Sequence, residues 1–280
     1  MIEPIALVAC ISEPFMSIHP TAKIHPSSVI EDGAVVGENC TIGPFCLVGG
    51  NVVLASGVEL KSHVVVTGDT TIGDDTVVFQ FASIGAIPQD LKYDGEPTKL
   101  IVGKRNRIRE YVTMNLGTAQ GGGVTRIGDD NLIMASAHVA HDVQIGNRVI
   151  LVNSVAVAGH CIVDDDVIIG GLSGIHQWVR IGQGAIIGAL SMVTADVLPH
   201  ALVQGPRADL DGLNLVGLKR RGVARDDINQ LRAAFQMLKQ GEGSFKDRAS
   251  RLHEDFDSDY VARMVAFVMS DSDRGFLTPK

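Results

Sequence analysis

Aliphatic residues recur at every sixth position over most of the chain. Counting from Ile18, all twelve such positions to Ile84 are Ile, Val or Leu, a shorter run occupies 102–114, and a second run of twelve extends from Ile127 to Val193. A period of six matches neither a helix nor a long strand. It suits a short strand followed by a tight corner. Because such repeats bury little alone and must stack, the pattern predicts a parallel β-helix with coils about 4.8 Å apart.

The same pattern divides the chain into segments. It is interrupted at 86–101 and 115–126, and insertions into a solenoid leave it as loops, often on the binding side. After residue 200 the apolar spacing becomes helical, which predicts helices over 210–221, 226–239, 245–256 and 259–269. We therefore predict an N-terminal extension (1–17), a β-helix (18–200) and a C-terminal α-helical domain (201–280) that covers the open strand edges of the last coil.

Stacking brings distant polar residues together. If three hexapeptides make one coil, residues 18 apart superimpose, which predicts two neighbouring columns: His141, Gly159 and Gln177, and Asp142, His160 and Trp178. Three coils span only about 10 Å, so these residues form one patch, with His138 one corner away. Lys92 lies in the first insertion, from which it can reach the patch of its own or a neighbouring chain.

Two kinds of chemistry fit this patch. An imidazole is the usual general base near neutral pH, a carboxylate can fix its tautomer, and a glycine leaves its backbone N–H open to an oxyanion. Asp142 can serve His141 only if a corner separates them, since neighbouring strand residues face opposite ways. The competing interpretations are a solvated surface and a zinc site built between subunits from His138, His141 and Asp142.

Two further segments carry candidate chemistry. The basic triplet 219–221 suits diphosphates and acidic partners, although an exposed helix face is the commoner explanation of a lone basic triplet. Glycines 121–123 lack the GKS/T ending of a nucleotide loop, so a flexible loop is expected there.

Composition narrows the function classes. The chain has 280 residues and a net charge of −8, which argues against a general nucleic-acid binder. Its four cysteines are too few and too scattered for a disulfide framework, and they form no CxxC pair typical of zinc sites; a reducing cytoplasm fits. No apolar run reaches the roughly 18–20 residues of a membrane span, and no Lys or Arg precedes the apolar segment 5–11, so no secretory signal is expected.

Several motifs resemble one family when taken in order. The segments LKSHVVV, QDLKY, RNRIRE, GTAQGGG, AHVAHD and NLVGLKRRG are similar to those of UDP-N-acetylglucosamine O-acyltransferases, and the resemblance covers about Ile24 to Arg221. It implies an all-β left-handed parallel β-helix, an exception to the usual crossover hand, and a homotrimer with active sites between subunits. It also implies transfer of a 3-hydroxyacyl chain from acyl carrier protein to the 3-hydroxyl of UDP-N-acetylglucosamine, the first step of lipid A biosynthesis. No cofactor is expected, because the thioester already supplies an activated acyl group.

The resemblance also implies residue roles. His141 would be the general base, Asp142 would orient it, and Gly159 would donate its N–H to the oxyanion. Residues expected to position the substrates are Asp90, Lys92, His138, His160 and Gln177, and those expected to face the nucleotide or the phosphopantetheine are Asn214, Arg220 and Arg221.

Two positions depart from the family pattern. Val216 stands where relatives have an acidic residue, which puts one nucleotide contact in doubt. Ala189 occupies the position, often glycine, that sets acyl length, so a donor of roughly ten to twelve carbons is expected from the lost burial. Two alternatives stay open: an N-acyl or coenzyme A-dependent β-helix acyltransferase, and a trimeric zinc-binding or scaffold protein.

Overall fold

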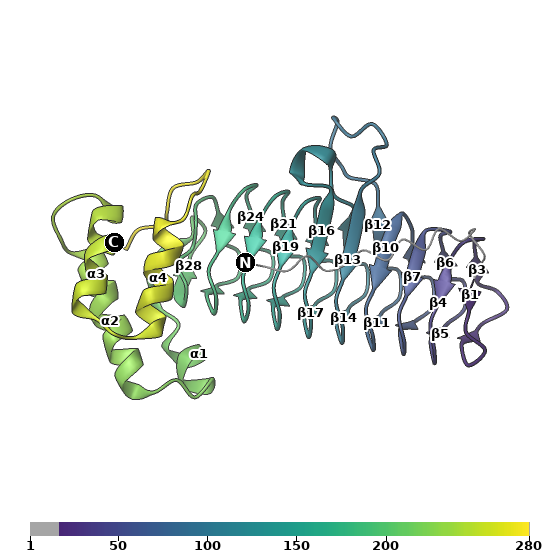
Figure 1. The fold of residues 1–280 in the computed structure, drawn as a ribbon, viewed down its shortest axis with the longest axis horizontal. Coiled ribbons are helices and arrows are strands. Elements are labelled where there is room, and N and C mark those ends of the chain that lie inside the picture. Colours follow the sequence, from purple (N-terminus) through teal and green to yellow (C-terminus); the bar gives the residue numbers. More distant parts are fainter. Residues whose placement is uncertain (1–16, 280) are drawn as a thin grey trace, which may run out of the picture.

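The computed structural model describes residues 17–279 and shows a left-handed parallel β-helix with three sheets as the faces of a prism (Figure 1). Each coil adds one strand to each sheet. The first sheet contains β1 (Ser17–Ile18), β4 (Val35–Val36), β7 (Val52–Leu54), β10 (Asp69–Ile72), β13 (Lys99–Val102), β16 (Val124–Ile127), β19 (Gln144–Ile145), β22 (Ile162–Val163) and β25 (Arg180–Ile181). The third contains β3 (Val29–Ile30), β6 (Leu47–Val48), β9 (Val65–Val66), β12 (Ser83–Ala86), β15 (Thr113–Asn115), β18 (His138–Val139), β21 (Ala156–Val157), β24 (Gly174–Ile175) and β27 (Met192–Val193).

The second sheet is the longest, because two late strands extend it. It contains β2 (Lys23–Ile24), β5 (Thr41–Ile42), β8 (Glu59–Leu60), β11 (Val77–Val78), β14 (Arg107–Ile108), β17 (Leu132–Ile133), β20 (Ile150–Leu151), β23 (Ile168–Ile169), β26 (Ile186–Ile187), β28 (Ala201–Gln204) and β29 (Asp209–Leu213).

The six-residue pattern is the core of the prism. Its aliphatic side chains are buried from Val36 onward, whereas Ile18, in the first coil, is 37% exposed because no coil lies below it. Val139 pairs with Val157, and Val157 pairs with Ile175, each step being 18 residues. The predicted fold and the 18-residue stacking are confirmed.

Corners explain why polar residues gather in columns. At many corners of the prism, one residue has a positive φ. Examples are Asp142 (61°), His160 (63°) and Trp178 (67°). Asp, Asn and His tolerate this left-handed region better than most side chains. The corner position therefore favours residues that also carry chemistry.

The two insertions are shorter than predicted. Ala86 still belongs to β12, and β13 already begins at Lys99, so the first loop is 87–98. Asn115 ends β15 and Val124 begins β16, which confines the second loop to 116–123 and its short 3-10 turn (Ala119–Gly121). The predicted bounds were too wide because strand pairing with the adjacent coils continues past the last aliphatic position. Both loops project from the same side of the prism (Figure 1).

The boundary of the helical domain also differs from the prediction. β28 still extends the second sheet beyond residue 200, and 210–213, predicted as the start of the helix 210–221, belongs to β29, which pairs antiparallel with β28. Leu210 and Leu213 are buried there, so the same apolar spacing satisfies a strand once a sheet edge is available. The helices are α1 (Leu215–Arg220), α2 (Arg225–Lys239), α3 (Phe245–Asp255) and α4 (Asp259–Met269).

The helices stand at one end of the prism, as predicted (Figure 1). Within residues 17–279, no helix has both the length and the apolar character needed to span a bilayer. The predicted N-terminal extension lies outside the described residues except for Ser17, which belongs to β1.

Candidate active site

His141 and Asp142 form a buried pair at the corner between β18 and β19. The Nδ1 atom of His141 lies 2.8 Å from Oδ2 of Asp142, and both residues are buried. A carboxylate only accepts hydrogen bonds, so Nδ1 carries a proton, and in the neutral imidazole Nε2 then keeps its lone pair. Asp142 has a positive φ, so the chain turns a corner at this residue, as its contact with His141 requires.

The second loop holds the carboxylate of Asp142 from the other side. The backbone N–H of Thr118 donates to Oδ1 (2.8 Å), and its hydroxyl donates to Oδ2 (2.6 Å). A side chain on Gly121 would place its Cβ 2.0 Å from the Asp142 carboxyl carbon, so only glycine fits. The interpretation of the glycine-rich segment as a merely flexible connection is therefore wrong: it closes around the carboxylate.

Gly159 lies directly above the His141 ring. A Cβ added to Gly159 would be 2.5 Å from Cε1 and 2.7 Å from Nε2 of His141, so glycine keeps the space in front of the basic nitrogen open. Its carbonyl accepts a hydrogen bond from the backbone N–H of Trp178. Its own N–H has no partner among residues 17–279. This N–H is available to an oxyanion formed near His141.

Two further histidines border the pair. His160 meets His141 edge-on (4.9 Å between ring centroids), stacks on Trp178 (3.9 Å), and its Nδ1 lies 3.6 Å from Oδ2 of Asp142. Burial lowers the pKa of His160 and outweighs the opposing charge of Asp142. His138 bonds the Thr113 hydroxyl through Nδ1 (2.7 Å), and burial, with a smaller effect of His141, lowers its pKa as well. Both rings therefore favour the neutral form.

Two open cavities meet at His141. The first, about 440 Å³, runs along the third sheet and is lined by Gln89, His138, Ala140, His141, Ala156, Ala158, Gly159, Gly174, Ile175, His176, Gln177 and Met192. The second, about 460 Å³, lies under the first loop and is lined by Gln89, Asp90, Leu91, Lys92, Thr118, Gln120, His141, His160, Gln177 and Trp178. The predicted residues from His138 to Gln177, together with Asp90 and Lys92, thus surround one site. One cavity is mainly apolar and the other mainly polar, so the site can accept a chain and a polar group at once.

The loops that complete the site are tied together. A Glu96 carboxylate oxygen lies 3.3 Å from the backbone N–H of Ala119, and the Asn115 amide donates to the carbonyl of Ile87. Asp90 accepts from the backbone N–H of Lys92 (3.0 Å), which shapes the loop where both face the polar cavity.

The pair could also contribute to a metal site. Ligand atoms of His141, Asp142 and His160 lie within 4.8 Å of one another. This trio differs from the predicted zinc set, because His160 takes the place of His138. In this arrangement Asp142 already accepts hydrogen bonds from His141 and Thr118.

The structure does not place Asn214, Arg220 and Arg221 with the other predicted site residues in a single chain. Asn214 is buried and caps α1: its amide donates to the Gly184 carbonyl, and its oxygen accepts from Gly217. Arg220 and Arg221 end the same short helix, exposed to solvent, and neither lines a cavity with His141.

Arg221 is held beside a buried histidine that the sequence did not single out. Its Nη2 atom lies 3.5 Å from Nδ1 of His200. Burial, and then the charge of Arg221, lower the pKa of His200 to about 4.

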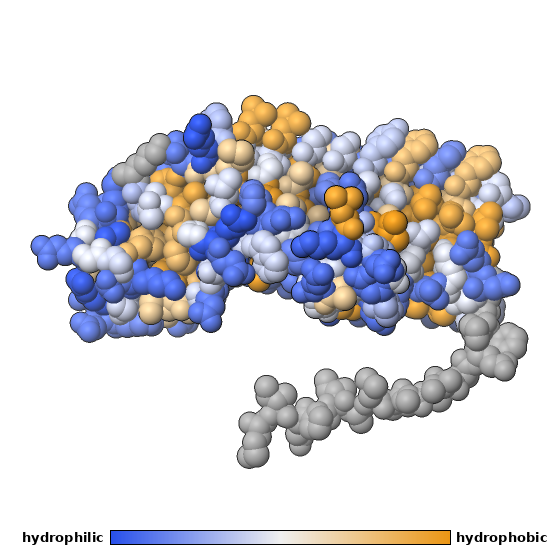
Figure 2. Space-filling view, turned by 90° about the horizontal axis from the view of Figure 1, so that it is seen from above, coloured by the Kyte–Doolittle hydropathy of each residue, from blue (hydrophilic) through white to orange (hydrophobic). Residues whose placement is uncertain are grey.

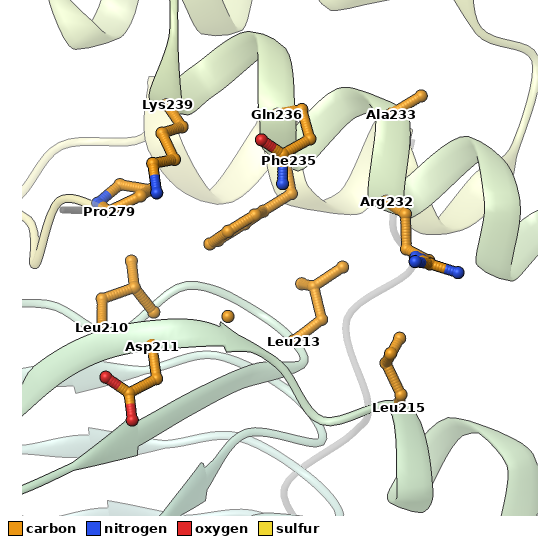
Figure 3. Close-up of a pocket in the computed structure, with 11 residues that line it drawn as sticks. Leu210, Asp211, Leu213, Leu215, Arg232, Ala233, Phe235, Gln236, Lys239 and Pro279 are labelled. Atoms are coloured by element: carbon orange, nitrogen blue, oxygen red, sulfur yellow. The ribbon is translucent and has the colours of Figure 1, made fainter.

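A separate cavity lies between β29 and α2 (Figure 3). It measures about 390 Å³, and Leu210, Leu213 and Phe235 give it an apolar floor, with Arg232 and Lys239 at its rim. None of the predicted site residues lines it.

Sequence reasoning missed three residues of the site. The position of Thr118 in the second insertion was visible in the sequence, but its contact with Asp142 could not be predicted from it. His176 and Met192 follow the 18-residue spacing from Ala158 and Gly174, so their placement was predictable, although nothing in the pattern marked them as functional.

Family comparisons match most of the chain. A model described as UDP-N-acetylglucosamine O-acyltransferase, domain 2, matches residues 196–277, and one for bacterial transferase hexapeptides matches 125–159. A third, for a GMPPB C-terminal domain, matches 12–120.

Individual relatives agree with these matches. An acyl-[acyl-carrier-protein]–UDP-N-acetylglucosamine O-acyltransferase of Paracoccus denitrificans is 64% identical over 72% of this chain and 77% of its own length. The enzyme of the same name from Nautilia profundicola is 45% identical over 72% and 78%. The solved UDP-N-acetylglucosamine acyltransferase of Campylobacter jejuni superimposes with a TM-score of 0.87 at 40% identity, covering 92% of this chain and all of its own.

Proposed function

The chain belongs to the acyl-[acyl-carrier-protein]–UDP-N-acetylglucosamine O-acyltransferase family, and from that premise we propose that His141 is the general base of its reaction. As a member, the protein is an acyltransferase that moves an acyl chain from acyl carrier protein to UDP-N-acetylglucosamine, the first step of lipid A biosynthesis. The observation that carries the proposal is the contact of Nδ1 of His141 with Asp142, which leaves Nε2 of the neutral ring beside Gly159, at the point where the two cavities meet.

The reaction then proceeds by two proton transfers, to and from His141, and one exchange of acyl bonds. Nε2 of His141 takes the proton of the sugar 3-hydroxyl as its oxygen attacks the thioester carbonyl. The Gly159 N–H stabilises the tetrahedral oxyanion, and Asp142 stabilises the imidazolium. Collapse forms the ester and breaks the carbon–sulfur bond, and the imidazolium gives its proton to the leaving thiolate, which departs as the thiol.

The two cavities suit the two substrates. The apolar cavity along Ala156, Gly174 and Met192 accepts the 3-hydroxyacyl chain, and the polar cavity beside Asp90 and Lys92 accepts the sugar. His138, His160 and Gln177 line these cavities and position the reacting groups. From the family resemblance, Asn214, Arg220 and Arg221 are expected to contact the nucleotide or the phosphopantetheine. Asn214 also caps α1.

The exposed corner of the prism supports a homotrimer. Hydrophobic side chains reach the surface along the prism (Figure 2). At the corner between the second and third sheets, the rings of Phe45, His63, Phe81 and Tyr111 follow one another at 5.0–5.1 Å between centroids, with three of the four large and exposed. A ladder of this kind is unusual on a monomer surface and typical of an interface. Trimerisation along it would put neighbouring prisms beside the cavities.

A direct assay tests the function. Purified protein is incubated with UDP-N-acetylglucosamine and 3-hydroxyacyl carrier proteins, and the product mass is measured, with light scattering on the same preparation to test the trimer. We expect a gain equal to one 3-hydroxyacyl group, held as an alkali-labile ester. An amide product, transfer from acyl-coenzyme A at a comparable rate, or no transfer would contradict the proposal.

Ala189 is expected to limit the acyl chain. It is exposed at the corner that precedes β27, three residues before the cavity-lining Met192. Ala189→Gly should shift the preferred donor to longer chains. Each newly buried methylene contributes about 0.8 kcal/mol, or about fourfold in kcat/KM. A series of donors from eight to sixteen carbons measures the shift.

Ala135→Gly is the matched control, since Ala135 occupies the same corner three coils away, and its chain-length profile should stay that of the wild type. An unchanged profile for Ala189→Gly, or a wild-type preference for chains of fourteen carbons or more, would refute the expected role of Ala189.

A further inference from the structure

The C-terminal tail crosses back over the coils that form the active-site corner. After α4, the Ser272 hydroxyl donates to Oδ2 of Asp196 (2.6 Å), the N–H of Asp196 donates to the Gly275 carbonyl (2.8 Å), and the N–H of Leu277 donates to the Asp196 carbonyl (2.9 Å). Asp196 is fully buried and pairs with Arg180 (2.7 Å). The tail is therefore fastened to a buried ion pair one coil from Gln177.

Arg274 extends from this tail to the site. Its Nε donates to the backbone carbonyl of Gln177 (3.0 Å), and its Nη2 lies 2.7 Å from Nδ1 of His176. Its backbone N–H donates to the Ser272 hydroxyl (3.0 Å), which fixes where the side chain leaves the tail. One guanidinium thus holds two consecutive residues that line the apolar cavity.

The chemistry of this contact determines the tautomer of His176. Nδ1 of His176 also lies 3.3 Å from the Gln177 carbonyl oxygen, which can only accept. The guanidinium lies closer, at 2.7 Å, carries only donors and keeps its proton in proteins, so Nδ1 of His176 must be the acceptor. The proton of the neutral ring is then on Nε2, where no residue from 17 to 279 accepts it. The cavity lining beside it (Ala156, Ala158, Gly174 and Met192) offers no other side-chain hydrogen bond. His176 therefore presents a donor to the part of the cavity that these four residues line.

We propose that Arg274 is a positioning residue for acyl transfer: it holds His176 as the Nε2–H tautomer, so that this N–H can donate to an oxygen of the acyl donor in the apolar cavity. The identity of that ligand rests on the proposed function. The tautomer does not, because it follows from the contact between Arg274 and His176 alone.

Loss of the guanidinium should leave the fold intact. Ser272, Gly275 and Leu277 anchor the tail independently, and Phe276 packs against Phe245 and Phe267. Arg274→Ala can therefore separate positioning of His176 from attachment of the tail, with thermal unfolding as the check.

The tautomer is read from histidine nitrogen chemical shifts. In protein labelled with 15N-histidine, the signals missing from His176→Gln identify the ring. In the wild type without substrates, we expect a pyridine-like Nδ1 and a pyrrole-like Nε2. Arg274→Ala should move both shifts toward the average of the two tautomers, whereas Arg274→Lys, which still offers a donor to Nδ1, should retain more of the wild-type pattern.

Kinetics tests the consequence. Arg274→Ala should lower kcat/KM for the acyl donor about 3- to 10-fold, the usual effect of losing a hydrogen bond between uncharged groups, with KM for UDP-N-acetylglucosamine unchanged. In the His176→Gln background the same substitution should have little effect, since an amide NH₂ needs no tautomer selection. Arg251→Ala, which removes an exposed guanidinium bound to the Glu242 carbonyl, is the matched control and should resemble the wild type.

Unchanged His176 shifts in Arg274→Ala would overturn the proposal, and so would an equal kinetic loss in both backgrounds. If the wild type shows the predicted tautomer but transfers no acyl group, the proposed function fails while the role of Arg274 in fixing the tautomer stands.

Discussion

Replacing His141 by alanine is expected to lower kcat/KM by about 10²–10⁴, the usual contribution of a general base. The reason lies in Nε2: Asp142 fixes the proton on Nδ1, Gly159 keeps the space before Nε2 open, and the neighbouring His160 is too weakly basic and differently directed to replace it. Initial rates of product formation at several concentrations of each substrate measure the loss.

A second variant separates chemistry from structure. His141→Asn places an amide nitrogen near the position of Nδ1, so Asp142 keeps its hydrogen bond while the base is absent. We expect both variants to lose activity equally and to keep the wild-type circular dichroism and oligomeric mass. His25→Ala removes an exposed histidine that bonds only its neighbour Ser27, and should be fully active. Activity of His141→Asn within tenfold of the wild type would exclude His141 as the base.

The part of the site that the sequence could predict is the part that repeats. His141, Gly159 and Gln177 are separated by uninterrupted steps of 18, so their stacking follows from the period alone. The position of the corner is equally important. In a strand, the side chains of His141 and Asp142 would point to opposite faces, whereas the positive φ of Asp142 lets its side chain turn back toward His141.

The parts that the sequence could not predict depend on irregular segments. Thr118 reaches Asp142 from a loop that has no period, and the contact spans 24 residues, which is not a multiple of the 18-residue coil. Arg274 contacts His176 across 98 residues from a tail without regular structure. β29 was mistaken for helix because its apolar spacing fits both, and the free edge of β28 decided the outcome.

The roles of Arg220 and Arg221 illustrate a different limit. These roles were inferred from the family resemblance. Within a single chain, the two arginines lie at the end of α1, away from His141. Their predicted contact with substrate therefore requires a neighbouring subunit, which is consistent with the proposed trimer.

Asp142→Asn is expected to fold and yet lose about 10³–10⁴ in kcat/KM, because it reverses the tautomer of His141. The backbone N–H of Thr118 can only donate, so the amide oxygen must take the position of Oδ1. The NH₂ group then replaces Oδ2, where the Thr118 hydroxyl can turn to accept from it. Nδ1 of His141 must accept as well, which moves the ring proton to Nε2 and removes the base.

The substituted side chain keeps all its hydrogen bonds in that arrangement, and the Thr118 hydroxyl loses one acceptor, so the melting temperature should fall only modestly while activity is lost. The 15N shifts of His141 should exchange their Nδ1 and Nε2 character, which distinguishes tautomer reversal from a local loss of structure. Asp130→Asn makes the same change at another corner with positive φ, where the carboxylate pairs with Arg105 in solvent, and should cost less than a factor of about five. Retention of the wild-type His141 tautomer in Asp142→Asn, or activity within tenfold of the wild type, would show that Asp142 does not set the base, and that the loop carrying Thr118 surrounds it for stability alone.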